Sequence, residues 1–167
     1  MADFIPAFES MLKNEGGYVL HNVAGDRGGM TYAGIARNMN PHWAGWAFID
    51  SKQEVPAHVV RDFYKPNFWD NIGGDQIVHQ AIAQHIFDFQ VNTGKPARVL
   101  AQLVVGVTPD GSFGPRTIDA LNAQDPEKFV LSYSLAKIAR YRDIVQRDKS
   151  QIKFLLGWIS RTLNGLK

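Results

Sequence analysis

The 167-residue sequence contains no cysteine, which excludes disulfide bonds and thiolate metal sites. It also lacks an apolar run of the roughly 18 residues that a helix needs to cross a bilayer. Its N-terminus has no basic segment followed by an apolar stretch, the pattern of a cleavable secretion signal. We therefore expect synthesis in the cytoplasm without a signal peptide, and no membrane insertion.

Other motifs are missing as well. No group of His, Asp and Glu has metal-ligand spacing, and no glycine-rich phosphate loop with Lys and Ser or Thr is present. We expect no metal and no cofactor. The net charge is +2, from 18 basic and 16 acidic residues that are scattered along the chain. This mild positive charge suits an anionic polymer, but without a basic run we expect no nucleic-acid partner.

The composition is that of an ordinary globular protein, with 45% hydrophobic and 20% charged residues. The length suits one domain, or one domain with a small lobe, and we expect a monomer. We predict a core that includes several large apolar side chains: Phe4, Phe8, Ile82, Phe87, Leu100 and Phe129.

The first segment has the spacing of an amphipathic helix, because apolar residues at positions 4, 8, 11 and 12 recur on one face. Asp3 is a suitable N-cap, and Gly16-Gly17 is a helix stop. Glu15 is therefore predicted to lie at the C-terminal end of this helix, where the chain turns away.

Residues 18–35 are rich in glycine and turn formers, and short β-capable pieces at 18–20 and 30–32 predict a small hairpin. The aromatic segment 41–49 has no clear pattern. Further helices are predicted over residues 54–64 and 76–91, from 96, from 115, and over 126–149 and 151–163. The fold class is mainly α, a helical bundle with a small N-terminal β-hairpin. The one plausible boundary, near Gly94, divides lobes 1–94 and 95–167, which we expect to pack as one compact unit.

Three residues around the predicted hairpin form a set suited to cleaving a glycosidic bond: Glu15, Asp26 and Thr31. That reaction needs one protonated carboxyl as acid and one ionised carboxylate as base or stabiliser. The negative end of a helix favours protonated Glu15. Asp26, beside Arg27, would stay ionised, and Thr31 would orient a water. The same residues are also ordinary in a helix stop, a turn and a strand, so spacing alone leaves both interpretations open.

The segments Glu15–Val19 and Asp26–Ile35 resemble the signature of glycoside hydrolase family 108, which comprises lysozyme-like N-acetylmuramidases of phage endolysins and bacterial secretion systems. The likeness continues through residues 63–64, 68–70, 87–94 and 154–158. It implies a lysozyme-like α+β fold and hydrolysis of the β-1,4 bond between N-acetylmuramic acid and N-acetylglucosamine in bacterial peptidoglycan, with Glu15 as the essential acid. Such an enzyme would need a holin or a dedicated secretion route to reach the cell wall.

By the same resemblance, Asp26 and Thr31 correspond to the aspartate and threonine of phage-type lysozymes. The loop between Glu15 and Asp26 is longer than the corresponding loop expected from this resemblance, so the role of Asp26 stays open. His21, in the same loop, is an alternative base. Residues 108–117 are similar to a motif of helical peptidoglycan-binding modules. This implies a second contact with the wall from residues 95–167, although the motif also describes a turn that begins a helix.

We predict five substrate-binding residues: Tyr18, Tyr32, Tyr64, Asp88 and Asn92. The tyrosines have the amphipathic character of a sugar-binding wall. Asn92 could bind an N-acetyl group. Asp88 could instead hold an arginine or the loop at Asn92 in place, and we favour such a structural role for it. His85, on the same predicted helix face, is expected to be a hydrogen-bonded structural histidine.

Two other functions remain open at this point. A lytic transglycosylase needs only one glutamate and releases an anhydro sugar without water. A non-catalytic wall-binding or secretion-accessory module could be built on the same fold. The sequence also leaves open whether the anomeric configuration is retained or inverted, because the distance between the two carboxyls decides this, at about 5–5.5 Å for retention and about 6.5–9.5 Å for inversion.

Overall fold

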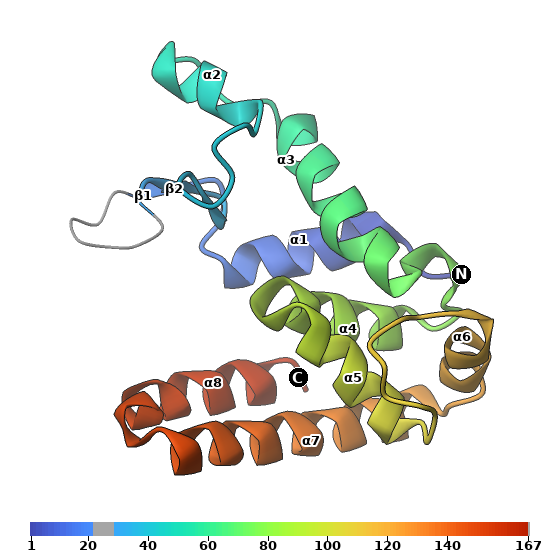
Figure 1. Cartoon of the computed structure of the whole chain (residues 1–167). Coiled ribbons are helices and arrows are strands. Elements are labelled where there is room, and N and C mark those ends of the chain that lie inside the picture. The colour runs from blue at the N-terminus through green and yellow to red at the C-terminus, as the bar shows by residue number, and fades with distance from the viewer. Residues whose placement is uncertain (22–28, 167) are drawn as a thin grey trace.

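A computed structural model describes residues 1–21 and 29–166. It is mainly helical, with a small three-stranded antiparallel sheet near the N-terminus, which confirms the predicted fold class (Figure 1). The helices are α1 (Phe4–Asn14), α2 (Gly45–Asp50), α3 (Ala57–Tyr64), α4 (Gln80–Thr93), α5 (Lys95–Val104), α6 (Pro115–Asn122), α7 (Pro126–Arg147) and α8 (Ile152–Asn164). The strands are β1 (Leu20–His21), β2 (Thr31–Tyr32) and β3 (Ile35–Ala36).

Local capping sets both ends of α1, as predicted. The Asp3 carboxylate accepts a hydrogen bond from the backbone N–H of Ile5 at 2.9 Å. At the other end, Gly16 and Gly17 have φ angles of +89° and +81°, which glycine adopts without strain. The Gly17 N–H donates to the carbonyl oxygen of Leu12 at 2.9 Å, so the chain closes the helix and leaves it directly after Glu15.

Several boundaries differ from the prediction. The α3 helix begins at Ala57 and not at position 54, because Pro56 is extended and disfavours a helical residue before it. The α4 helix begins at Gln80 and not at 76, since residues 74–76 form a separate 3₁₀ turn and His79 is extended. The aromatic segment 41–49 contributes to the short helix α2.

The sheet contains one strand more than the predicted hairpin. Strand β2 pairs with β1 on one side and with β3 on the other. Between β2 and β3 the chain turns within two residues, Ala33 and Gly34, whose φ angles are +50° and +80°. Positive φ at both positions is the geometry of the tightest antiparallel connection. Ala33 and Ile35 are buried, so this turn points into the protein.

One hydrophobic core cluster contains residues from both sides of Gly94. In its centre the rings of Phe4, Trp69 and Phe87 lie with centroids 5.6 to 5.9 Å apart. The predicted core residues are buried, except for Leu100, which is partly buried against the cluster. The two C-terminal helices α7 and α8 lie side by side beneath α4 and α5 (Figure 1). Among the described helices, none is both long and apolar enough to cross a membrane.

A lysine is buried within this arrangement. Lys137, on α7, is only 5% exposed, and its Nζ lies 4.9 Å from the ring centroid of Tyr133 and 5.1 Å from that of Phe89. These cation–π contacts replace part of its lost hydration. Burial nevertheless lowers the pKa of Lys137 from 10.5 to about 8, although the nearby charge of Asp88 acts to raise it.

The lowered pKa of Lys137 makes stability depend on pH. Between about pH 8 and 10.5 the unfolded chain holds the Lys137 proton while the folded chain loses it, so stability rises with pH. We expect the free energy of unfolding of the wild type, measured relative to Lys137→Met, to increase by about 3 kcal/mol across this range. Denaturant titrations from pH 7 to 11 check this. Lys128→Met, at an exposed lysine on the same helix, should show no such change. A constant difference between wild type and Lys137→Met would contradict the expectation.

Candidate active site

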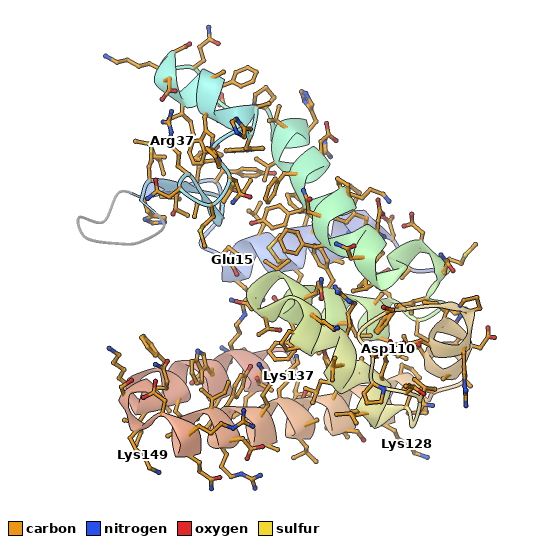
Figure 2. All side chains as sticks on the ribbon, viewed as in Figure 1. Glu15, Arg37, Asp110, Lys128, Lys137 and Lys149 are labelled. Carbon is orange, nitrogen blue, oxygen red and sulfur yellow. The ribbon has the colours of Figure 1, made fainter. Side chains whose placement is uncertain are left out.

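The candidate acid Glu15 follows the last residue of α1, and its backbone N–H donates to the carbonyl oxygen of Met11 at 3.1 Å. Its side chain is 22% exposed. Figure 2 shows Glu15 in the middle of the molecule, between the small sheet and the pair of helices α7 and α8. The carboxylate is therefore partly shielded by protein while it remains accessible to a ligand.

Glu15 is held by an arginine from the far end of the chain. The Nη2 atom of Arg161, on α8, lies 2.9 Å from Oε1 of Glu15 and 2.9 Å from Oδ1 of Asp88 on α4. The same Asp88 oxygen accepts a hydrogen bond from Nδ2 of Asn14 at 3.1 Å. One guanidinium thus links three helices, and all three charged side chains are less than 30% exposed.

The surroundings of Glu15 include a cation that the sequence analysis did not name. Its place at the negative end of the α1 dipole was predicted to favour the protonated carboxyl. The structure places the guanidinium of Arg161 2.9 Å from this carboxylate. Sequence reasoning did not identify Arg161. It lies 146 positions from Glu15, and only the possibility of an arginine partner for Asp88 hinted at it.

The turn between β2 and β3 lies against Glu15. A β-carbon added to Gly34 would stand 3.3 Å from Cγ of Glu15 and 3.4 Å from its Oε2. It would also stand 2.6 Å from the hydroxyl oxygen of Tyr64, which is too close for real atoms. With φ at +80° as well, this position requires glycine. The hairpin can therefore approach the carboxylate only because residue 34 has no side chain.

Tyr64 supports this turn from below. It is 1% exposed, and its hydroxyl donates to the carbonyl oxygen of Ala33 at 2.8 Å. Burial raises the pKa of Tyr64 far above its usual range, and the charge of Glu15 raises it further. Because so little of the ring is exposed, the structure speaks against the predicted contact of Tyr64 with a sugar and gives it a role in positioning the hairpin.

The other predicted tyrosines form a row of rings on the sheet. Tyr18 is 43% exposed and lies 6.5 Å from the ring centroid of Tyr32, which is stacked on Trp43 at 6.1 Å. Burial, together with Tyr18 and Glu54, raises the pKa of Tyr32. Rings in such a row can pack against the apolar face of a sugar. Trp43 was not among the predicted site residues because segment 41–49 showed no recognisable period.

Of the remaining predicted catalytic residues, Asp26 lies outside the described part of the chain. Thr31, on β2, pairs with His21 on β1, and its hydroxyl lies 3.4 Å from the carbonyl oxygen of Gly29. His21 is exposed, and its Nε2 would be 3.9 Å from a β-carbon added to Gly16. The alternative base His21 is thus brought beside the residue that follows Glu15.

The predicted face of α4 is present as well. Asp88 contacts Arg161, which is one of the two structural roles considered for it from the sequence. Asn92 is exposed and donates from its side chain to the carbonyl oxygen of Asp88 at 2.7 Å. The ring nitrogens of His85 lie 2.8 and 2.9 Å from the carbonyl oxygens of Ala81 and Gly165. Substrate binding by Asp88 and Asn92 stays a prediction.

Comparisons with known proteins cover both parts of the chain. The family model described as Glycosyl hydrolase 108 matches residues 8–94, and the model described as Predicted Peptidoglycan domain matches residues 95–163. Among solved structures, the chain is similar to the one described as "Structure of Brucella abortus SagA", with a TM-score of 0.61 and 23% identity over 98% of this chain and 95% of that chain. This likeness shows a shared fold. No curated protein matches the chain.

The close approach at Gly34 can be tested against a matched glycine. Gly17 also has a positive φ, but a β-carbon there would meet no atom of the described residues within 4 Å. We expect Gly17→Ala to lower the free energy of unfolding by about 1 kcal/mol, the cost of the backbone conformation alone. Gly34→Ala should cost about 3 kcal/mol, because it adds the collision with Tyr64.

Denaturant unfolding of both variants measures these costs. The substitution Tyr64→Phe removes the hydroxyl oxygen that the added carbon would meet. It should therefore lower the free energy of unfolding less in the Gly34→Ala background than in the wild type. Equal losses of unfolding free energy for Gly17→Ala and Gly34→Ala would show that the hairpin is not in close contact with Tyr64 and Glu15 at this position.

Proposed function

The chain belongs to the glycosyl hydrolase 108 family, and we propose that it hydrolyses the β-1,4 bond between N-acetylmuramic acid and N-acetylglucosamine in peptidoglycan, with Glu15 as general acid. The observation that carries this proposal is the placement of Glu15. A partly buried carboxylate stands at the end of α1, enclosed by the turn at Gly34 and by Arg161.

The acid role follows from what cleavage of a glycosidic bond needs. The leaving oxygen must receive a proton from a group held at a fixed position. Glu15 is the last residue before a double-glycine break, and its side chain has neighbours on two sides, so its orientation is restricted. Arg161 can remain with Asp88 when Glu15 takes up a proton, because the guanidinium has a separate partner in that carboxylate.

A second group must then activate a water or stabilise positive charge on the sugar. We propose Asp26 for this role, with Thr31 orienting the water and His21 as the alternative base. Support comes from the sheet, which places His21 and Thr31 opposite each other on neighbouring strands. The exposed ring of Tyr18 and the partly buried ring of Tyr32 suit the sugar-binding wall, and we add Trp43 to it.

The C-terminal region contributes to both binding and catalysis in this proposal. Residues 95–163 match the predicted peptidoglycan domain, which supports wall binding. Arg161 belongs to the same region and contacts Glu15 directly. We therefore propose that the region is needed for the geometry of the acid as well as for attachment. The enzyme would act on the cell wall after release by a holin or a secretion route, as in phage endolysins.

Replacing the acid tests the proposal. We expect Glu15→Gln to lower the rate of solubilising purified peptidoglycan at least about 100-fold, because the amide cannot donate the proton. Glu9→Gln is the matched control, since Glu9 is an exposed glutamate on α1, the helix that Glu15 follows. A folded Glu15→Gln protein with full activity would refute the role of Glu15.

Mass spectrometry of the released fragments separates the competing functions. Reducing ends at N-acetylmuramic acid are expected for the hydrolase. Anhydro ends would identify a lytic transglycosylase, which needs only one glutamate. Tight binding of cell-wall sacculi by the wild type without release of any fragment would identify a non-catalytic wall-binding module and contradict the proposal.

A further inference from the structure

A pocket of about 240 Å³ lies between α1, α4, α7 and α8. Phe89, Tyr141, Ile144 and Trp158 contribute apolar surface to it. Arg161 and Asp88 also line the pocket, whereas Glu15 is not among its lining residues. Arg161 therefore lies between the candidate active site and the pocket. Its Nη2 contacts Glu15, and its side chain lines the pocket.

The described lining of this pocket carries more positive than negative charge. Its cations are Lys137 and Arg140 of α7 and Arg161 of α8, and Asp88 is the carboxylate that opposes them. Asp88 is already occupied, since it accepts hydrogen bonds from Arg161 and Asn14. His85 also lines the pocket, and both of its ring nitrogens face backbone carbonyl oxygens. Within the described lining of the pocket, no further carboxylate is available to pair with Lys137 and Arg140 of α7.

Two of these cations have hydrogen-bond donors without an acceptor among the described residues. Lys137 is 5% exposed, and within the described part of the chain it makes ring contacts but no hydrogen bond. The Nε of Arg140 is fully buried and has no hydrogen-bond partner among the described residues. Buried N–H donors in proteins are almost always paired, and a buried charge without a partner is costly. A pocket lined by a buried ammonium and by a guanidinium with an unpaired nitrogen, neither with a carboxylate partner among the described residues, therefore indicates an anionic ligand.

The lining also indicates which anion. The ring and aliphatic surfaces beside the donors suit a ligand with a small apolar body. A carboxylate accepts hydrogen bonds from several N–H groups at once and pairs with arginine in a fixed geometry. We propose that this pocket is a binding site for a small monocarboxylate, held by Lys137 and Arg140.

This site goes beyond the proposed hydrolysis, because neither its donors nor its ligand need Glu15 to be the catalytic acid. The carboxylate could come from a free organic acid, or from the lactyl group of N-acetylmuramic acid. Binding to the full chain, followed by shifts of backbone amide signals in NMR spectra, tests the site directly. The probes are acetate, D-lactate and inorganic phosphate, each compared with chloride at equal ionic strength.

We expect acetate and D-lactate to cause saturable shifts around the pocket, at residues such as Ile144 and Thr162. Lys137→Met and Arg140→Gln should each weaken this binding about tenfold or more, the usual effect of losing one charged hydrogen bond. Lys128→Met, which removes an exposed lysine from the same helix, should leave it unchanged (Figure 2). Methionine and glutamine suit these positions in size, and dispersed spectra of both variants will show that they fold.

The remaining ligands distinguish the two sources of the carboxylate and include the results that would contradict the proposal. Binding of N-acetylmuramic acid but not of N-acetylglucosamine, which lacks the lactyl carboxylate, would identify the cell wall as the source. Binding of acetate and D-lactate alone would identify a free acid. Shifts that chloride reproduces, that Lys137→Met leaves intact, or that only phosphate produces would show that the pocket is not a carboxylate site.

Discussion

The structure depends on one guanidinium that joins its two ends. Arg161, in the last helix, contacts Glu15 at the end of the first helix and Asp88 in the central helix α4. A partly buried cation between two carboxylates stays in place only if all three helices pack correctly. The candidate acid is therefore positioned by the packing of these helices. The turn of the small sheet lies close to it at Gly34, where a side chain would not fit.

This arrangement changes how the two matched regions relate. Residues 8–94 match a glycosyl hydrolase family and residues 95–163 a predicted peptidoglycan domain, which suggests catalysis in one region and attachment in the other. Yet the hydrophobic core is shared between them, and Arg161 of the second region touches Glu15 of the first. Lys137 of α7 and Arg161 of α8 also line a positively charged pocket. The second region thus contributes a side chain to the candidate active site.

Features set by neighbouring residues were predictable from the sequence. Asp3 caps α1 and Gly16-Gly17 ends it, because each acts within a few positions along the chain. Features set by tertiary packing were not. Tyr64 has the character of a sugar-binding residue, but packing buries it under the hairpin. The pairing of Glu15 with Arg161 has no local signature, because the two residues meet only once α8 has packed against α4 and α7.

The central claim is that Arg161 serves the reaction by holding Glu15. A double-mutant cycle on the rate of peptidoglycan solubilisation tests it most directly, with Arg161→Met and Glu15→Gln alone and together. If the arginine acts through the glutamate, Arg161→Met will slow the wild type strongly but will cause no further loss in the Glu15→Gln background. Losses that multiply in the double mutant would show that the two residues act independently, and would contradict the account.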